Sequence, residues 1–214
     1  MSGRSTTDEL AGHWDEAYAS RGERVSWLQR DARVSLELID SLGVGSEAGV
    51  IDVGGGTSVL AEQLAERGYR DISVLDLSAQ ALAVARERAG PDAPIQWLHA
   101  DLLAWQPTRR YDLWHDRAVL HFLVDPVERD MYLQRLRGAL GEAGAVVIGT
   151  FAPHGPDRCS GLPVARYAPD QIAELLGPDF QLVARRGEEH VTPSGLVQPF
   201  TWIAGVLTPA RSSA

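Results

Sequence analysis

The stretch Val50-Ile51-Asp52-Val53-Gly54-Gly55-Gly56-Thr57-Ser58 decides the fold of this 214-residue chain. Its first four residues form a short apolar run of the kind found in buried parallel strands. The three glycines that follow let the backbone turn sharply and approach a ligand without a Cβ in the way. Thr57 or Ser58 can then cap a helix that ends at Gly68. The stretch therefore predicts a strand, a tight bend and a helix.

The same alternation continues towards the C-terminus. Further apolar runs predict strands at residues 72–76, 95–99, 111–115 and 145–150. Helical patterns follow or separate these runs at about residues 78–90, 126–140 and 170–176. Strands that alternate with helices favour right-handed crossovers and a parallel sheet covered on both faces. Two last runs, at 180–184 and 200–204, read as a hairpin, so the final strand is expected to run antiparallel at or near one edge.

Two helical patterns precede the glycine stretch, from about Ser5 to Ser20 and from about Asp31 to Leu42. Apolar residues recur in both at helical spacing, and Gly43 ends the second pattern. A polar loop that ends at Trp27 joins them. The chain therefore begins with helices before the sheet starts.

Length and composition indicate one globular domain. The chain is 44% hydrophobic and 23% charged, and no apolar run approaches the length of a membrane-spanning helix. Residues 1–10 lack the apolar segment of an ordinary secretory signal, so a cytoplasmic location and no membrane association are expected. The formal net charge of −9 disfavours nucleic acid as a partner.

Residue counts also exclude several kinds of chemistry. All 20 basic residues are arginine, so no lysine can form a Schiff base or act as a general base. The only cysteine, Cys159, excludes an internal disulfide and any zinc site built on several thiolates. The six histidines show no tight ligand pattern, and no metal site is expected.

Aspartates stand at the ends of the first three predicted strands. Asp52 lies just before the glycines, Asp76 follows 24 residues later, and Asp101 ends the third strand. An acid at the position of Asp76 can accept both hydroxyls of a ribose. Asp101 can accept from an adenine amino group, with Leu102 or Leu77 against the ring. Each aspartate alone could instead cap the next helix or turn, but the set together with the glycines favours an adenosine site.

Two ligand classes compete for the glycine bend. A dinucleotide fold uses the pattern G-x-G-x-x-G, in which free amides at a helix N-terminus hold a pyrophosphate. Val59 stands where the third glycine would be, and Asp52 would repel a pyrophosphate. A carboxylate there suits a ligand that carries an ammonium and a sulfonium. The residues thus favour a positively charged adenosyl ligand over a dinucleotide.

The motifs Asp52-Val53-Gly54-Gly55-Gly56, Asp76-Leu77-Ser78 and His99-Ala100-Asp101-Leu102 resemble those of class I S-adenosylmethionine-dependent methyltransferases of the small, single-domain bacterial type. The resemblance spans roughly Trp14 to Ala204. It implies a Rossmann-like, doubly wound seven-stranded α/β sheet of order 3-2-1-4-5-7-6, with strand 7 antiparallel. It also implies S-adenosylmethionine as cofactor and S-adenosylhomocysteine as product, with the methionine part near Gly54, Gly55 and Gly56.

The resemblance divides the single domain, residues 1–214, into three parts: a helical lid over 1–43, a cofactor-binding core over 49–151, and an acceptor-side loop with the hairpin over 152–207. In the lid, Trp14 and Tyr18 are expected to contact the cofactor, with Tyr18 donating to its carboxylate, and Trp27 to contact the acceptor. These aromatic residues could instead simply bury the first helix against the sheet.

The acceptor side is expected to follow the fourth strand, a region that faces the methyl group in the resembling family. His115, Asp116 and His121 are the candidates to orient or deprotonate an acceptor. Arg117, Arg158 and Arg166 are the candidates to bind an acidic group on it. The alternatives are a structural Asp116–Arg117 pair, a His121 packed in the interior, and two solvated arginines in the 151–167 loop.

The sequence supports methyl transfer by in-line displacement to an O, N or S nucleophile of a small molecule. Three other functions stay open: methylation of protein side chains, oxidation or reduction with NAD, and cofactor binding without chemistry. The acceptor, the oligomeric state and the need for a general base cannot be read from the residues.

Overall fold

The computed structural model of the protein describes residues 7–21 and 25–208. Seven strands form one sheet in the order β3-β2-β1-β4-β5-β9-β8. Their bounds are β1 Gly49–Val53, β2 Asp71–Asp76, β3 Ile95–His99, β4 Tyr111–Arg117, β5 Leu140–Phe151, β8 Phe180–Val191 and β9 Val197–Leu207. The remaining short strands, β6 (Arg158–Cys159) and β7 (Leu162–Pro163), pair separately within the loop after β5. Counted without them, the large sheet has the predicted order 3-2-1-4-5-7-6.

The direction of the strands also agrees with the prediction. Strands β1 to β5 pair in parallel, whereas β9 pairs antiparallel with both β5 and β8. Because parallel strands end at the same edge, the residues that follow β1, β2, β3 and β4 are brought together there. This edge is where the glycines and the strand-end aspartates of the sequence meet.

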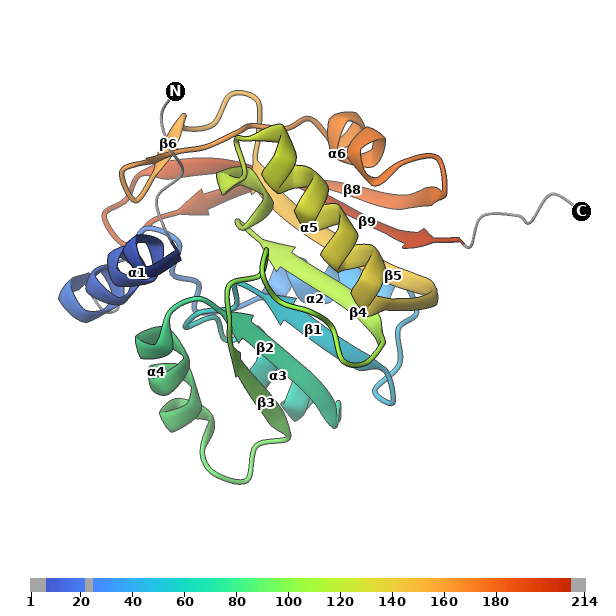
Figure 1. Ribbon diagram of the computed structural model, residues 1–214, viewed down its shortest axis with the longest axis horizontal. Coiled ribbons are helices and arrows are strands. Elements are labelled where there is room, and N and C mark those ends of the chain that lie inside the picture. Colours follow the sequence, from blue (N-terminus) through green and yellow to red (C-terminus); the bar gives the residue numbers. More distant parts are fainter. Residues whose placement is uncertain (1–6, 22–24, 209–214) are drawn as a thin grey trace, which may run out of the picture.

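Helices cover both faces of the sheet. Their bounds are α1 Thr7–Arg21, α2 Arg33–Ser41, α3 Leu60–Glu66, α4 Ala79–Ala89, α5 Pro126–Ala139 and α6 Pro169–Leu176. Figure 1 shows α5 and α6 in front of the sheet and α2 and α3 behind it. Each face has its own buried core, one beneath α2 and α3 and the other beneath α5 and α6. The burial of β1 on both sides explains why all its residues except Asp52 are apolar or glycine.

Local signals in the sequence set several element ends. Ser78 caps α4 as predicted, its side chain accepting from the backbone N–H of Ala81. The prediction that Thr57 or Ser58 caps the next helix is wrong: α3 begins at Leu60, and its N-cap is Val59, which makes no side-chain cap bond. The Ser58 hydroxyl still accepts from the Leu60 N–H at 3.1 Å, just before the helix. The expected start of the first helix at Ser5 lies outside the described residues.

Three strands, β5, β8 and β9, are longer than the sequence indicated. The helix α5 ends at Ala139 and β5 begins at Leu140, so Gly141 lies in a strand and does not mark the end of the helix. The Arg110 guanidinium donates to the carbonyls of Arg137 and Leu140, and thereby satisfies backbone groups where the helix gives way to the strand. The hairpin strands β8 and β9 extend beyond their predicted five-residue runs. Their backbone pairing continues from the pair Phe180–Leu207 to the pair Val191–Val197.

Candidate active site

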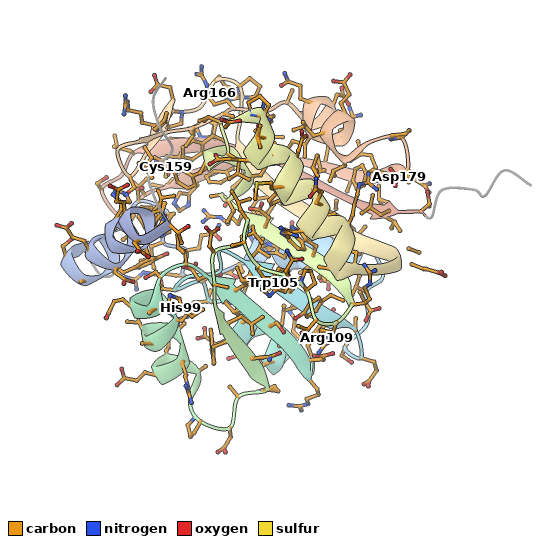
Figure 2. All side chains as sticks on the ribbon, viewed as in Figure 1. His99, Trp105, Arg109, Cys159, Arg166 and Asp179 are labelled. Carbon is orange, nitrogen blue, oxygen red and sulfur yellow. The ribbon has the colours of Figure 1, made fainter. Side chains whose placement is uncertain are left out.

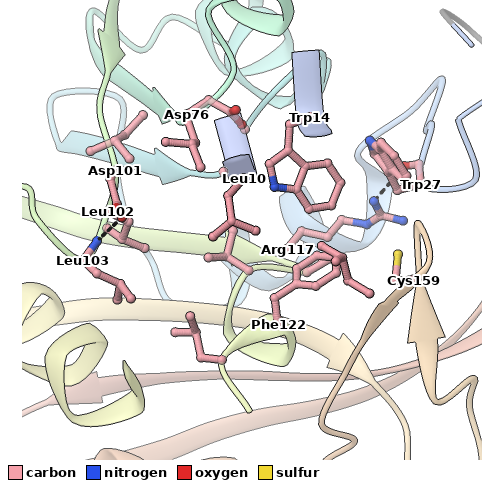
Figure 3. Close-up of a pocket in the computed structure, with 18 of the residues that line it drawn as sticks. Leu10, Trp14, Trp27, Asp76, Asp101, Leu102, Leu103, Arg117, Phe122 and Cys159 are labelled. Atoms are coloured by element: carbon pink, nitrogen blue, oxygen red, sulfur yellow. Dashed lines mark hydrogen bonds between the residues drawn. The ribbon is translucent and has the colours of Figure 1, made fainter. Parts of the chain in front are cut away.

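A cavity of about 790 Å³ lies at the carboxyl ends of β1 to β4, beneath α1. This volume is in the range of pockets that hold cofactors and small ligands. Figure 3 shows Asp76 and Asp101 on one side of it and Arg117, Trp27 and Cys159 on the other. The cavity brings together most of the residues that the sequence singled out: Trp14, Tyr18, Trp27, Asp52, Gly54, Gly55, Asp76, Leu77, Asp101, Leu102, His115 and Arg117.

The glycine bend leaves no room for side chains. Gly54 and Gly56 have φ angles of +63° and +50°, a region that L residues with side chains rarely adopt. A Cβ at Gly54 would lie 2.1 Å from Val119 Cγ2, and one at Gly56 would lie 2.3 Å from the Tyr18 hydroxyl. A Cβ at Gly55 would lie 2.7 Å from Asp52 Oδ2. The three glycines therefore leave no side chain between the bend and its neighbours, and Asp52 lies at the cavity wall beside Gly54 and Gly55.

One side of the Asp52 carboxylate is held by a buried hydrogen-bond chain. Asp52 Oδ1 lies 2.6 Å from His115 Nδ1, and His115 Nε2 lies 2.9 Å from the Ser35 hydroxyl. All three residues are buried. The other oxygen, Asp52 Oδ2, is buried and has no hydrogen-bond partner. A buried acceptor without a partner is costly, and a ligand that donates to it removes that cost.

Asp76 ends β2, and Asp101 follows the end of β3 by two residues, on the same side of the cavity. Asp76 Oδ1 accepts from the backbone N–H of Ser78 at 2.7 Å. Burial raises the pKa of the Asp76 carboxyl to about 6, although hydrogen bonds from the Ser78 and Gly56 backbone lower it. Asp101 accepts from the Leu103 N–H at 2.9 Å and from the Thr7 hydroxyl at 2.7 Å. Both aspartates also stabilise the turns that follow their strands, so the capping role and the cavity-lining role coexist.

The helix α1 closes the cavity from above. Leu10, Trp14 and Tyr18 follow one another at four-residue spacing, which places them on one face of the helix, and all three line the cavity. The Asp15 carboxylate ties the helix to the start of α4, accepting from the Ser78 hydroxyl at 2.5 Å and from the Gln80 N–H at 3.2 Å. The helix therefore covers the cavity, and its role as a lid stays a prediction.

Aromatic side chains form the wall of the cavity opposite the aspartates. Trp14 makes edge-to-face contacts with Trp27 and Phe122, at ring-centre distances of 5.5 and 5.1 Å. The Trp27 indole N–H donates to the Tyr18 hydroxyl at 3.1 Å, and burial raises the pKa of that hydroxyl. The Tyr18 hydroxyl therefore stays protonated at neutral pH and remains available as a donor to a ligand.

Asp116 lies outside the cavity. It is fully buried, and its oxygens accept from the Val119 N–H at 2.8 Å, the Leu120 N–H at 3.1 Å and the Tyr132 hydroxyl at 2.7 Å. These bonds fix the start of the short helix at Leu120–Phe122. Burial raises the pKa of Asp116 to about 6. No ion pair joins it to Arg117, because consecutive strand residues point to opposite faces.

His121 is also buried and does not line the cavity. Its Nδ1 accepts from the Phe151 N–H at 3.4 Å, and its ring contacts those of Phe122 and Phe151 at centre distances of 4.4 and 4.6 Å. Burial, together with the Arg117 charge, lowers its pKa to about 3. His121 is therefore neutral at physiological pH and packs in the interior.

The two arginines of the long loop do not reach the cavity. Arg158 donates to the Gly161 carbonyl at 2.8 Å, and Arg166 donates to the Gly155 carbonyl at 3.2 Å. Both are exposed, and Figure 2 shows Arg166 at the outer edge of the molecule. The same loop instead brings Cys159, Leu162 and Pro163 to the cavity wall through the β6–β7 hairpin.

Sequence reasoning did not name several lining residues, among them Leu10, Val119, Phe122 and Leu162. Leu10 was visible as part of the same helical face as Trp14, but an apolar residue on a helix is more often simply buried. The others depend on how the segments after β4 and β5 fold back over the sheet. Among the residues that the structure describes, no three His, Cys, Asp or Glu side chains group as metal ligands, and no helix is long and apolar enough to span a membrane.

We predict that replacing Asp116 with alanine lowers the free energy of unfolding by about 2–4 kcal/mol, because buried donors lose their acceptor. Urea unfolding monitored by circular dichroism measures this loss. Asp170→Ala is the control, since Asp170 forms only an exposed pair with Arg185 and should cost under about 1 kcal/mol. An unchanged stability with strongly reduced turnover would instead place Asp116 in the chemistry.

The sheet order, the glycine bend and the strand-end aspartates define the class I S-adenosylmethionine-dependent methyltransferase fold. In agreement, residues 50–144 match the family model described as "Methyltransferase domain". These residues run from β1 to the first part of β5 and contain the motifs after β1, β2 and β3. The segment that carries the predicted motifs is thus similar to methyltransferase domains.

Two curated relatives are similar over about half of the chain. The trans-aconitate 2-methyltransferase of Rhizobium etli is 35% identical over 99 residues, which are 46% of this chain and 36% of that protein. Nodulation protein S of Bradyrhizobium diazoefficiens is 28% identical over 106 residues, half of each chain. The chain thus spans between about a third and half of the length of these relatives.

Solved structures agree with the fold over nearly the whole chain. The 1,6-didemethyltoxoflavin-N1-methyltransferase of Burkholderia thailandensis, solved with that compound and S-adenosylhomocysteine, has a TM-score of 0.72 at 21% identity. The comparison covers 97% of this chain and 93% of that one. The N-methyltransferase NodS of Bradyrhizobium japonicum, in complex with S-adenosylhomocysteine, has a TM-score of 0.67 at 19% identity, with 92% and 100% covered. At these identities the likeness concerns the fold.

Proposed function

We propose that the protein transfers a methyl group from S-adenosylmethionine to an O, N or S nucleophile of a small molecule and releases S-adenosylhomocysteine. The observation that carries the proposal is the glycine bend, which leaves Asp52 Oδ2 buried without a partner at the wall of the cavity. A bend built for a dinucleotide presents free amides to a pyrophosphate, whereas this one presents a carboxylate. The site therefore suits a ligand with a positively charged end.

The cofactor would lie along the ends of β1, β2 and β3. Asp52 Oδ2 would accept from its ammonium group, Asp76 from its ribose hydroxyls, and Asp101 from its adenine amino group, with Leu77 and Leu102 beside the ring. When bound, S-adenosylmethionine supplies a methyl group on a positively charged sulfur that a nucleophile displaces in line. The His115–Ser35 chain holds Asp52 in position for this role.

We place the acceptor on the aromatic side of the cavity, near Trp27, Phe122 and Arg117. The walls there exclude water and align the nucleophile, which is the main contribution a protein makes to a displacement of this kind. Because Asp116 and His121 lie outside the cavity, we propose that they support the fold and that the acceptor arrives as a ready nucleophile. Relatives named for small-molecule methylation support an acceptor of that size.

The test of the proposal is a methyl-transfer assay. The protein is incubated with S-adenosylmethionine carrying a radioactive methyl group and with a panel of phenols, carboxylates, amines and thiols. We expect label in at least one class of acceptor, and at least about fivefold less label when Asp76→Ala replaces the parent protein at the same sub-saturating cofactor concentration. Tight cofactor binding without transfer to any acceptor class would contradict the proposal and favour a cofactor-binding module without chemistry.

The affinity for the cofactor is expected to depend on pH through Asp76. The carboxyl, with a pKa of about 6, accepts hydrogen bonds from ribose hydroxyls best when ionised. The dissociation constant of S-adenosylhomocysteine should therefore fall as the pH rises from 5 to 7 and then level off. Calorimetric titrations at several pH values measure this. In Asp76→Asn the step near pH 6 should vanish, and its persistence would assign it to another group.

A further inference from the structure

The charges around the cavity are unevenly distributed. Carboxylates line it from several elements: Asp52, Asp76, Asp101, Asp125 and Glu128. Among the described lining residues, Arg117 is the only arginine. It extends from the end of β4, and Figure 3 shows its guanidinium close to Trp27 and Cys159, on the side of the cavity away from Asp76 and Asp101.

The guanidinium of Arg117 is buried, and only one of its three nitrogens makes a hydrogen bond. Its Nη1 donates to the Trp27 carbonyl at 2.9 Å, and its Cζ lies 4.8 Å from the centre of the Phe200 ring. Its Nε and Nη2 are buried without hydrogen-bond partners. Burial lowers the pKa of Arg117 to about 10, so the side chain still carries its positive charge at neutral pH.

No described carboxylate forms an ion pair with this cation. The charges of Glu188 and Asp52 favour the charged form of Arg117, but neither carboxylate is bonded to it. Glu188 accepts from Gln29 at 3.0 Å and from the Trp202 indole at 2.7 Å, and Asp52 uses Oδ1 for His115. A buried charge with no directly bonded counter-ion is costly, and proteins keep one mainly where a ligand supplies the missing charge. The position of Arg117 at the cavity wall provides for such a ligand.

The two unpartnered donors define the shape of that ligand. The N–H groups of Nε and Nη2 form one edge of the guanidinium and point the same way, which matches the two oxygens of a carboxylate. We propose that Arg117 is the receptor for a ligand carboxylate. The inference rests on the proposed function, since it concerns the same cavity, and it adds the chemical group that this wall recognises.

Two ligands could bring this carboxylate. One is the cofactor, whose amino-acid end carries an ammonium and a carboxylate. Asp52 Oδ2 and the Nε–Nη2 edge of Arg117 both lack hydrogen-bond partners, and both residues line the same cavity. The other is the acceptor, which would then be a carboxylic acid with an apolar or aromatic body facing Trp14, Trp27 and Phe122. The shared chemistry is a carboxylate, and binding measurements can distinguish its source.

The experiment compares two matched pairs of probes on the full chain and on Arg117→Met. The first pair is S-adenosylhomocysteine and 5′-methylthioadenosine, which lacks the amino-acid end. The second is benzoate and benzamide, titrated with S-adenosylhomocysteine present. We expect Arg117→Met to weaken the carboxylate member of one pair at least tenfold and its neutral counterpart less than threefold. The pair that responds identifies the source of the carboxylate.

Three variants keep the test interpretable. Arg158→Met and Arg166→Met remove exposed arginines that also donate to loop carbonyls. Neither variant should change the affinity for any of the four probes. Arg117→Lys keeps the positive charge but lacks the paired N–H donors of the guanidinium, and it should recover part of the affinity that Arg117→Met loses. If Arg117→Met does not fold, Arg117→Lys takes its place in the test. Equal effects on both members of each pair, or none, would overturn the proposal. If the parent protein does not bind S-adenosylhomocysteine, the proposed function fails, and the benzoate pair, titrated in the absence of that ligand, still tests the inference.

Discussion

Replacing Asp76 with alanine is expected to weaken S-adenosylhomocysteine binding by about 5- to 150-fold. The range corresponds to roughly 1–3 kcal/mol, the usual cost of leaving ligand hydroxyls unpaired in a buried site. Asp76 is 7% exposed and lies at the carboxyl end of β2. Calorimetric titration of the parent and the variant at pH 7.5 measures the ratio, because the carboxyl is ionised there.

A second aspartate of the same strand is the control for this prediction. Asp71 begins β2 at the opposite edge of the sheet and pairs with Arg109 on the surface. Asp71→Ala should leave the affinity for S-adenosylhomocysteine unchanged within twofold. An unchanged affinity in Asp76→Ala would show that the ribose is held by another group, and equal losses in both variants would indicate a general effect on β2.

Gly56→Ala is expected to reduce S-adenosylhomocysteine binding at least tenfold. The added Cβ would lie 2.3 Å from the Tyr18 hydroxyl and 3.4 Å from Asp76 Oδ2. Tyr18 is a rigid ring held by Trp27, so either the α1 lid or the bend must move. The substitution therefore disturbs both the lid and the strand-end acid that line the cavity.

Gly43→Ala separates this steric effect from backbone strain. Gly43 has a φ of +67°, similar to the +50° of Gly56, but a Cβ there would meet nothing within 4 Å. Alanine at Gly43 should cost about 1 kcal/mol of stability and leave binding unchanged. Thermal unfolding and titration of both variants test the pair. Unchanged binding in Gly56→Ala would contradict the close packing of the lid on the bend.

Local patterns were enough to predict most of the fold. The apolar run of β1, the glycines after it and the Ser78 cap each depend on a few neighbouring residues, so a single sequence reveals them. The strand-end positions of Asp52, Asp76 and Asp101 follow from the same patterns. Parallel pairing then places these three at one edge, which is why their common position at the cavity could be predicted from the sequence.

The acceptor side could not be predicted in the same way, because it depends on contacts between distant segments. Asp116 and Arg117 are neighbours in the sequence, yet the pleat of β4 turns one towards Tyr132 and the other towards Trp27. His115 meets Asp52 because the two are register partners in β4 and β1. The loop arginines Arg158 and Arg166 donate to carbonyls of their own loop and do not face the cavity. No pattern in the sequence indicates which of these two positions an arginine in the loop adopts.

The central claim is that the glycine bend and its carboxylates bind an adenosyl ligand with a positively charged end and exclude a dinucleotide. Isothermal titration of the full chain with S-adenosylhomocysteine and, separately, with NAD tests it most directly. The account predicts one site for S-adenosylhomocysteine, bound at least a hundredfold more tightly than NAD. No heat of binding for S-adenosylhomocysteine at millimolar concentration, or tighter binding of NAD, would contradict it.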